Sequence, residues 1–342
     1  MKRKKLKIAV FLGGPSSEHE VSLKSGENLI ENLDKEKFEI YKVLISKNLE
    51  WKIFLIKNKK ENLLKEFNET FLTLKFLKKV LKIDYCFLAL HGEFGEDGKI
   101  QTLLEIFNLN YSGSGPEASM LGMDKIRSSL LFQSIGLNIP EFFYFSLKEW
   151  DLRRKEFLKI VKERIGFPLV VKPNKCGSSV GISLVKNQKE IEKAIKKAAR
   201  FNQEIMIQRY IKGKEITCGV IEKNNSLFAL PPTEIIPKKS DFFDWKAKYE
   251  DEASEEITPP KTINLKIQKK IQENAILVFQ ILGAKDFSRI DMILEEKTGK
   301  IYILELNSLP GLTKNSLLPK ELKAAKIDFS EFLETLIYNS IK

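Results

Sequence analysis

Cysteine is scarce in this sequence, and long apolar runs are absent. The three cysteines among 342 residues, Cys86, Cys176 and Cys218, lie far apart and lack the spacing of metal ligands. This pattern argues against a disulfide framework and predicts buried thiols in a reducing compartment. The most apolar helical stretch, Ala275 to Leu282, is far shorter than the roughly 20 residues that span a bilayer. We therefore expect a soluble, cytoplasmic protein that does not bind to membranes.

Internal repeats and low-complexity tracts are also absent, and the positive charge is dispersed along the chain. Lys and Arg number 58 and Asp and Glu 46, so the net charge is +12, which by itself suggests an anionic partner such as nucleic acid or ATP. The lysines lie in amphipathic stretches such as 189–200 and 261–270, with acidic residues among them. Such stretches are typical of solvated helix faces, so we do not expect nucleic-acid binding.

The first 115 or so residues alternate strand-like and helix-like segments, which predicts a parallel sheet with crossover helices. Strands are expected at Lys7–Leu12, Phe38–Ile45 and Asp84–Leu90, and a helix at Ser22–Leu33. Two polar loops, 13–20 and 91–99, follow strand ends, where ligands of open α/β sheets gather. We expect one edge of an active site there. Residues 50–81 match no motif and are interpreted only as a hairpin or helix insertion.

The remainder of the chain has a different pattern. A second unit begins near Pro116, with a helix predicted at Asp124–Ile135. From residue 147 onward, helices mix with strands whose connections look like hairpins, which predicts an antiparallel sheet. Residues 231–260 are rich in charge, are bracketed by prolines and show no apolar period. Loops of this length inside compact domains are usually functional, so a lid is predicted.

The strongest chemical signal is the segment SRIDMILEEKTGKIYILELNSLPG, residues 288–311. Side chains two apart on a strand share a face, so Arg289 points with Asp291. Glu305 points with Asn307 for the same reason. If the strands pair, two carboxylates, an amide oxygen and a guanidinium converge, a set that suits magnesium beside phosphate. A surface salt-bridge ladder is the alternative. We favour the metal site because Asn307 leads into SLPG, a turn that presents backbone N–H groups.

A glycine- and serine-rich loop provides the second signal, in VVKPNKCGSSVGI, residues 170–182. An apolar strand ends at Lys172, and the amides of the following loop can surround phosphate oxygens. The segment is not a Walker A motif, because no Gly-Lys-Ser/Thr opens a helix. Taken alone, a plain hairpin turn explains it equally well, but beside the other groups it indicates anion binding.

The two N-terminal loops, GGPSSEHEVS and HGEFGEDGKIQ, place charged groups at strand ends beside helix starts. A small zwitterion could be held there by carboxylates and amide donors. By themselves these loops indicate little. Glu18 and Glu20 could decorate a helix N-terminus, and His91 could be a structural histidine.

Together these segments resemble the D-alanine–D-alanine ligases of the ATP-grasp superfamily, from about Lys7 to about Phe332. The motifs that carry the resemblance are, in order, GGPSSEHEVS, HGEFGEDG, YSGSGPEASMLGMDK, VVKPNKCGSSVG, KAKY, RIDMIL and LELNSLPGLTKNS. The resemblance implies an α/β (α+β) ATP-grasp fold. An N-terminal Rossmann-like domain would cover 1–115, and two α+β subdomains, 116–211 and 212–342, would enclose the nucleotide beneath a lid at 231–260.

The resemblance also implies ligands and residue roles. The ligands are ATP, two Mg²⁺ ions, for which Mn²⁺ is an alternative, and two D-alanine molecules. The nucleotide would contact Lys125, Lys172, Gly177, Gln208, Arg209 and Glu215, and the metals would bind Asp291, Glu305 and Asn307. The first D-alanine would meet Glu18 in a network with Ser178 and Tyr249, and the second would meet Ser316 and Leu317, with His91 among the substrate contacts. Lys248 would reach the γ-phosphate when the lid closes, and Arg289 with the Gly311 N–H would stabilise an oxyanion.

The implied reaction joins two D-alanine molecules through a D-alanyl phosphate, releasing ADP and phosphate, as a step toward peptidoglycan. Metals and cationic side chains must first neutralise the carboxylate and triphosphate, and the lid must exclude water from the acyl phosphate. A homodimer is expected from the same resemblance.

Three residues depart from the pattern that is usual in the family. Gln208 and Arg209 stand where the family usually has a Glu-Lys pair, and Trp245 where a tyrosine is frequent. Tyr249 favours an amine nucleophile, because ligases that make the D-alanine–D-lactate ester lack this lid tyrosine. The alternatives are another ATP-grasp carboxylate–amine ligase, a D-alanine–D-lactate ligase and, from a different class, a nucleic-acid-binding protein.

Overall fold

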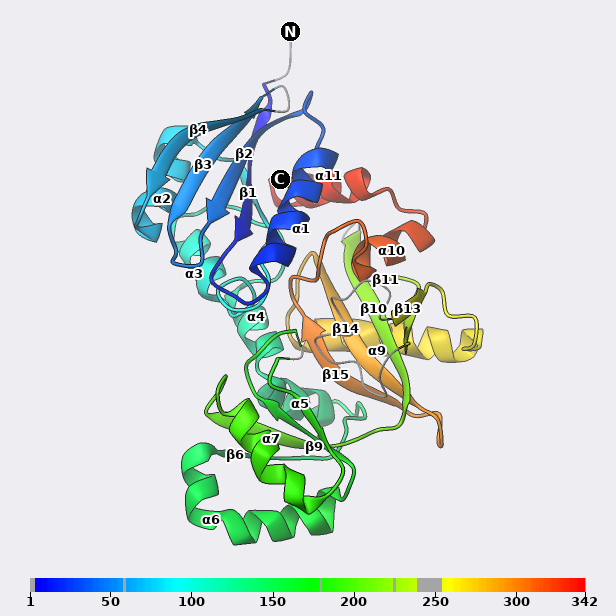
Figure 1. Cartoon of the computed structure of the whole chain (residues 1–342). Coiled ribbons are helices and arrows are strands. Elements are labelled where there is room, and N and C mark those ends of the chain that lie inside the picture. Colours follow the sequence, from blue (N-terminus) through cyan, green and yellow to red (C-terminus); the bar gives the residue numbers. More distant parts are fainter. Residues whose placement is uncertain (1–3, 58–59, 179, 224–225, 239–253, 342) are drawn as a thin grey trace.

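Three sheets, stacked along the molecule, make up the fold (Figure 1). The computed structural model describes residues 4–57, 60–178, 180–223, 226–238 and 254–341. Lys248, Tyr249 and Trp245 therefore lie outside the described residues. The mixed α/β class expected from the sequence is confirmed.

The first sheet is parallel at its centre and antiparallel at one edge. Its strands, in the order β4-β3-β2-β1-β5, are β1 (Leu6–Gly13), β2 (Phe38–Ile45), β3 (Trp51–Lys57), β4 (Lys60–Phe67) and β5 (Tyr85–Leu88). β1 runs parallel to both β2 and β5, as predicted, and α1 (His19–Asn32) forms the crossover from β1 to β2. Residues 8–12 are fully buried, as expected of a central parallel strand that is covered on both faces.

The segment that matched no motif extends this sheet. β3 pairs antiparallel with β2, and β4 pairs antiparallel with β3. α2 (Thr70–Phe76) and a helical turn, η1 (Leu77–Leu81), follow this hairpin. The interpretation of residues 50–81 as a hairpin or helix insertion is therefore confirmed, and the predicted parallel pairing is found for β1, β2 and β5. A hairpin can add to a sheet edge without a crossover helix, and this explains the mixture.

The second sheet is antiparallel and lies below the first in Figure 1. Its order is β6 (Phe142–Ser146), β9 (Glu204–Arg209), β7 (Leu169–Pro173) and β8 (Ser183–Val185). The helices of this lobe are α6 (Leu147–Ile160), η2 (Val161–Ile165), η3 (Gln188–Glu190) and α7 (Ile191–Ala198). Leu169 and Val171 pack against this helical layer, so that Val170 and Lys172 point to the opposite face.

The third sheet contains the predicted hairpin. Its strands are β10 (Gly213–Lys223), β11 (Ser226–Ala229), β12 (Thr233–Pro237), β13 (Ser254–Ile257), β14 (Phe287–Glu295) and β15 (Ile301–Asn307). They follow the order β13-β12-β10-β14-β15, with β11 beside β10. α9 (Leu265–Ile281) covers one face. β12 and β13 lie inside the stretch predicted as a loop, so that prediction was too broad: Thr233–Pro237 and Ser254–Ile257 pair with each other.

Three short helices connect the first sheet to the rest. They are α3 (Lys99–Ile106), α4 (Pro116–Met123) and α5 (Lys125–Ser134). α5 confirms the helix predicted at Asp124–Ile135 to within one residue at each end. It begins there because the carboxylate of Asp124 accepts the N–H of Arg127 at 3.0 Å, an N-cap bond. α4 and α5 both pack against β15.

The chain ends against the domain in which it began. α10 (Leu317–Ala324) and α11 (Phe329–Ser340) contribute Leu318, Leu322, Leu333 and Leu336 to the core of the first sheet. Rings of β2 and α11 also meet, with the centroids of Phe38 and Tyr338 6.2 Å apart. Each sheet lies within one of the three predicted ranges, although these helices cross the boundary at 115/116 in space. The domain boundaries stay a prediction.

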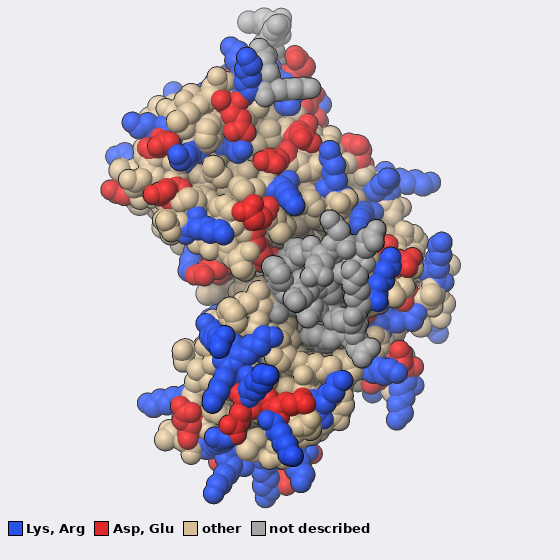
Figure 2. Space-filling view, in the orientation of Figure 1, with Lys and Arg blue, Asp and Glu red and all other residues tan. Residues whose placement is uncertain are grey.

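Charged side chains are unevenly distributed over the surface. Lys and Arg mix with Asp and Glu on the upper lobe but predominate on the lower lobe, which carries α6 and α7 (Figure 2). Residues 142–209 contain sixteen Lys or Arg and seven Asp or Glu, and so account for most of the net charge. No helix within the described ranges is long and apolar enough to cross a membrane.

The packing of α11 gives a stability prediction. Leu333 is fully buried in the first core, so Leu333→Ala should cost about 2–5 kcal/mol of unfolding free energy. Hydrogen exchange of β1 and β2 amides, more than 280 residues away in sequence, should accelerate. Leu152→Ala, at a position 75% exposed on α6, is the control. Unchanged exchange in β1 and β2 would show that α11 does not support that core.

Candidate active site

A cavity of about 1410 Å³ is lined by loops and α1 of the first domain and by residues of the second and third sheets. The residues around it include Glu18 and His91 from the first domain, Lys172 and Gln208 from the second sheet, and Asp291 from the third. All sixteen predicted site residues that lie within the described ranges line this cavity. The sequence prediction of one shared cleft is therefore supported by geometry.

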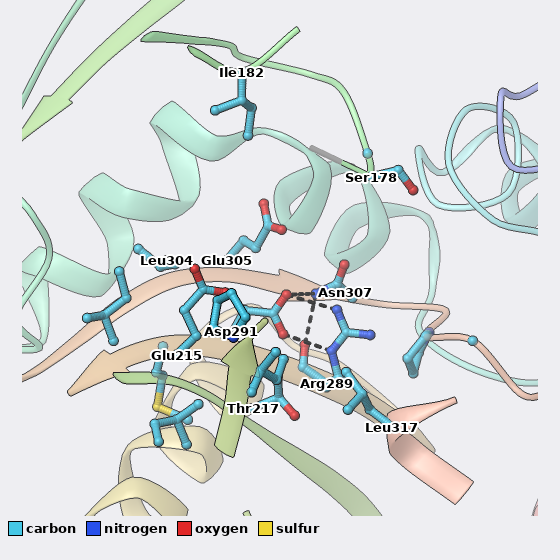
Figure 3. Close-up of a pocket in the computed structure, with 18 of the residues that line it drawn as sticks. Ser178, Ile182, Glu215, Thr217, Arg289, Asp291, Leu304, Glu305, Asn307 and Leu317 are labelled. Atoms are coloured by element: carbon cyan, nitrogen blue, oxygen red, sulfur yellow. Dashed lines mark hydrogen bonds and ion pairs between the residues drawn. The ribbon is translucent and has the colours of Figure 1, made fainter. Parts of the chain in front are cut away.

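The floor of the cleft is the predicted hairpin of β14 and β15. Its register pairs Arg289 with Asn307 and Asp291 with Glu305. Buried Ile290 and Met292 alternate with these residues and pack under α9, so the polar side chains point into the cleft (Figure 3). The convergence predicted from the two-residue spacing is confirmed.

Arg289 and Asp291 form a bidentate ion pair in the cleft. The guanidinium Nε and Nη2 donate to the two carboxylate oxygens, each at 2.8 Å, and Asn307 Nδ2 donates to Asp291 Oδ2 at 3.1 Å (Figure 3). Burial disfavours the charge of Arg289, but Asp291, with further help from Glu321 and Glu305, outweighs burial and raises the pKa of Arg289. A bidentate pair of this kind is rigid as well as strong.

Two lysines face the hairpin from the other side. Lys125 Nζ donates to the Cys176 carbonyl at 2.8 Å and lies 3.1 Å from Glu305 Oε2. Lys172 is only 6% exposed, and burial, reinforced by Lys125 and opposed by Glu305, lowers its pKa to about 8. A cation of lowered pKa facing a cleft is poised to accept an anionic ligand.

The glycine- and serine-rich loop lies against the first domain. A Cβ built at Gly177 would stand 2.8 Å from Glu18 Oε2, and one at Gly92 would also stand 2.8 Å from that oxygen. The two glycines therefore leave the space that the carboxylate occupies. Ser178 has a positive φ of 52° and lies on this loop above Asn307 in Figure 3. The loop, Glu18 and the hairpin thus meet within one cavity.

His91 is buried and joins the first domain to the SLPG turn. Its Nδ1 lies 2.9 Å from the Leu309 carbonyl and its Nε2 lies 2.9 Å from Ser25 Oγ. A carbonyl can only accept, so Nδ1 carries the proton and Nε2 accepts from Ser25. Burial lowers the pKa of His91, with Glu18 and the Leu309 carbonyl opposing, which keeps the ring neutral. His91 lines the cavity, but both of its ring nitrogens are engaged by protein groups, the Leu309 carbonyl and the Ser25 hydroxyl.

Glu96 is a residue that the sequence prediction did not single out. Its carboxylate accepts the N–H of Gly92 at 2.8 Å and the N–H of Leu309 at 3.0 Å, and burial raises its pKa to about 7. His91 and Glu96 therefore hold the carbonyl and the amide of Leu309 together. The signal was present in HGEFGEDG, but its partner lies 213 residues away and could not be read from spacing.

The segment after SLPG lines the cleft and contacts α1, where Asn28 Nδ2 donates to the Leu312 carbonyl at 2.7 Å. Ser316 Oγ lies 2.7 Å from Thr313 Oγ1, and a Cβ at Gly311 would stand 2.7 Å from that same Ser316 oxygen. α10 begins at Leu317, so its first N–H groups open toward the cavity that Ser316 and Leu317 line. Such helix ends favour anions.

Gln208 and Arg209 differ in what they face. Gln208 is 3% exposed, lines the cavity, and its Nε2 finds no hydrogen-bond acceptor within the described part of the chain. Buried donors of this kind usually await a ligand or water. Arg209 lies at the rim, where its Nη2 donates to Glu141 Oε2 at 2.8 Å and to the Arg164 carbonyl at 2.9 Å. The guanidinium of Arg209 is therefore held at the rim by Glu141 and the Arg164 carbonyl and does not point into the cleft.

A buried carboxylate supports the floor of the cleft from below. Glu321 of α10 accepts the N–H of Gly219 at 2.7 Å and the hydroxyls of Thr217 and Thr233 at 2.8 and 3.0 Å. Burial raises its pKa to about 7, while these hydrogen bonds and Arg289 oppose the shift. Glu321 can come this close only because residue 219 is glycine, since a Cβ there would lie 2.7 Å from Glu321 Oε2.

Glu321 gives a prediction about pH and stability. Its folded pKa exceeds its unfolded value, so the folded state binds the proton more tightly and stability falls as pH rises from about 4.5 to about 7. Glu321→Gln should flatten that dependence by about 1–3 kcal/mol across this range. Urea unfolding at pH 5 and pH 7.5 measures the effect, with exposed Glu66→Gln as the control. An unchanged slope in Glu321→Gln would refute this origin.

Comparison with known proteins gives a consistent result over the whole chain. Residues 7–114 match the family model described as D-ala D-ala ligase N-terminus, and residues 131–338 match D-ala D-ala ligase C-terminus. A D-alanine–D-alanine ligase from Clostridium beijerinckii is 39% identical over 337 residues, which is 98% of this chain and 99% of that protein.

Solved structures are similar over the same length. The VanG D-Ala:D-Ser ligase from Enterococcus faecalis matches with a TM-score of 0.85 and 31% identity, over 98% of this chain and 99% of that one. The D-alanine–D-alanine ligase from Bacillus anthracis, in complex with ATP, matches with a TM-score of 0.76 and 33% identity, over 99% and 97%.

Proposed function

The chain belongs to the D-alanine–D-alanine ligase family, and we propose that the cleft residues described above perform the ATP-dependent joining of two D-alanine molecules. It is an ATP-dependent ligase that produces D-alanyl-D-alanine, the dipeptide that this family supplies for peptidoglycan synthesis. The observation that supports the residue roles is the polar face of β14 and β15, which lies opposite Lys125 and Lys172 in a single cavity.

The oxygen atoms of this face suit magnesium. Asp291 and Glu305 provide carboxylates, and Asn307, whose Nδ2 donates to Asp291, keeps its carbonyl oxygen for another partner. Hard oxygen ligands of this type are those that Mg²⁺ prefers, with phosphate and water completing its shell. We propose that these three residues hold two Mg²⁺ ions, or Mn²⁺, which would neutralise phosphate charge when bound.

We place the triphosphate between the lysines and the Gly177 loop. Lys125 and Lys172 supply positive charge, and the loop supplies backbone N–H groups. The unpaired Gln208 amide would donate to the adenine ring beside apolar Val170 and Leu184, and Glu215 of β10 would meet the ribose. Arg209 is the weakest of the predicted nucleotide contacts, because Glu141 already holds its guanidinium at the rim.

The two D-alanine molecules would lie between the first and third domains. We propose that Glu18 receives the ammonium group of the first, with Ser178 beside it and Tyr249 from the lid. The start of α10, at Ser316 and Leu317, would receive the carboxylate of the second. His91 would act through the SLPG backbone that it holds, since both of its ring nitrogens are engaged.

The reaction follows from this placement. The carboxylate of the first D-alanine attacks the γ-phosphorus of ATP in line, and ADP leaves with the electron pair of the broken bond. Lys248 would approach the γ-phosphate in the closed lid. The neutral amine of the second D-alanine then attacks the acyl carbon of the resulting D-alanyl phosphate. The attacking nitrogen loses a proton, and phosphate leaves with the electron pair of the acyl C–O bond as the amide forms. Arg289 and the Gly311 N–H would stabilise the oxyanion between these steps.

The acceptor needs a direct test, because a similar structure is a D-Ala:D-Ser ligase. We expect phosphate release that depends on ATP and D-alanine, with D-alanyl-D-alanine as the product identified by mass. L-alanine alone should give none. D-serine or D-lactate, each mixed with D-alanine, should remain minor acceptors at neutral pH. A dominant mixed product would reassign the second substrate while leaving the ATP chemistry in place.

The metal site gives a second test. Glu305→Gln should lower kcat by at least about 100-fold, because a metal ligand is lost from a largely preformed site, while the circular dichroism spectrum stays unchanged. Glu66→Gln, in an exposed ion pair with Lys52 on the first sheet, is the matched control. Activity close to that of the unmodified enzyme, with the same magnesium requirement, would contradict the assignment.

The lowered pKa of Lys172 gives a third test of the proposed function. A triphosphate beside Lys172 favours the ammonium form, so binding of ATP near pH 8 should take up a fraction of a proton. The uptake should vanish near pH 6.5, where the lysine is already charged. Calorimetry in buffers of different ionisation enthalpy measures it. Lys172→Met should abolish the uptake, whereas exposed Lys175→Met should retain it. Equal uptake at both pH values would contradict this prediction.

We further propose a cytoplasmic homodimer. Exposed apolar side chains, Leu63 and Leu64 on edge strand β4 and Phe71 and Leu72 on α2, support association through the first domain.

A further inference from the structure

The glycine- and serine-rich loop is anchored at both ends by lysine side chains that reach backbone carbonyls. At its start, Lys125 Nζ donates to the Cys176 carbonyl at 2.8 Å. At its end, Lys197 Nζ donates to the Ile182 carbonyl, also at 2.8 Å. Lys125 lines the cleft, whereas Lys197 lies on α7 outside it. Of these two lysines, Lys197 therefore contacts the loop without lining the proposed nucleotide site.

α7 is built to present Lys197 to the loop. Ile191, Ala194, Ile195 and Ala198 bury one face of the helix, and α7 packs on β7 and β8. Lys197 lies in the last turn, where a cation is favoured by the helix dipole. Its side chain leaves the exposed face and crosses to the residue before β8.

Two rings hold the same point of the chain. Gly181 has a φ of +79°, and a Cβ there would stand 2.8 Å from Phe201 Cδ2 and 3.1 Å from Pro173 Cγ. Phe201 lies three residues beyond the end of α7, and its ring lies close to Gly181. Phe201 and Pro173 therefore pack near Gly181, and Lys197 binds the next residue, Ile182.

Ile182 carries this contact into the cleft. Its side chain lines the cavity with Val170 and Leu184, at the apolar end assigned above to the adenine ring (Figure 3). The contacts of Lys125 with Cys176 and of Lys197 with Ile182 restrict both ends of this loop. A loop that is already ordered loses less entropy when a ligand binds.

We propose that Lys197 is a positioning residue for ATP: its bond to the Ile182 carbonyl fixes the distal end of the phosphate-binding loop. This inference rests on the proposed nucleotide site. It assigns a role in ATP affinity to an exposed side chain that touches neither substrate nor metal. Loss of the bond should raise both the Kd and the KM for ATP and leave the chemical step and the D-alanine sites alone.

The test compares neighbouring lysines. Lys197→Met keeps most of the length of the side chain and its apolar stem but removes the donor, and should raise the KM for ATP by about three- to tenfold, the size expected for the net contribution of one hydrogen bond. kcat should stay within about twofold, and the KM for D-alanine should be unchanged. Lys197→Arg, which keeps a donor, should recover most of the ATP affinity.

Lys196→Met is the matched control. Lys196 is also exposed, sits in the same helical turn, and makes no hydrogen bond to the loop in the described structure. An ATP affinity as low in Lys196→Met as in Lys197→Met would overturn the proposal, because only general charge would then matter. So would an unchanged KM for ATP in Lys197→Met, or failure of the arginine to rescue.

Calorimetry with ATP and magnesium alone separates this proposal from the proposed function. If the unmodified enzyme binds ATP and Lys197→Met binds it as tightly, the anchor is refuted and the ligase assignment stands. If the unmodified enzyme binds no ATP, the nucleotide site itself is wrong. Thermal denaturation should give the same midpoint for all four proteins, and a fall confined to Lys197→Met would assign the bond to stability instead.

Discussion

The pairing of a buried guanidinium with a carboxylate is the constraint on which the cleft depends. Arg289 is charged in this buried position because Asp291 meets it with two hydrogen bonds of 2.8 Å, with further help from Glu321 and Glu305. The register of β14 and β15 fixes where that pair stands, opposite Asn307 and Glu305. A slip of one residue would turn Ile290 and Met292 toward the cleft and bury the charges under α9. Core packing therefore selects the register, and the register delivers the polar face.

The other parts of the cleft are held to this hairpin by contacts that are long in sequence and short in space. His91 and Glu96 grip the carbonyl and amide of Leu309, directly after β15. Lys125 reaches from α5 to Glu305 and to the glycine-rich loop. Groups from the first domain and from α5 thus meet at the hairpin or directly after it. A cleft assembled in this way can position substrates without a dedicated rigid core of its own.

The sequence predicted strands and helices well where the alternation of apolar and polar side chains is regular, as in β2 and β14. The limits of β2 agree with the sequence prediction, and the facing of Arg289 with Asp291 followed from spacing alone. Residues 50–81 were ambiguous because β4 is an exposed edge strand whose side chains show little apolar alternation. Glu96 and the outward turn of Arg209 depend on partners distant in sequence, Leu309 and Glu141, which no local period encodes. The roles of Lys248 and Tyr249 stay predictions, since both lie outside the described residues.

The return of α10 and α11 to the first sheet has a consequence for biosynthesis. The apolar face that these helices cover belongs to strands that are synthesised well before α10 and α11. Until α11 has been synthesised, the nascent first domain lacks part of its core and exposes the surface that α11 covers. Emergence of α11, rather than emergence of the first sheet, is then the step at which this core can close.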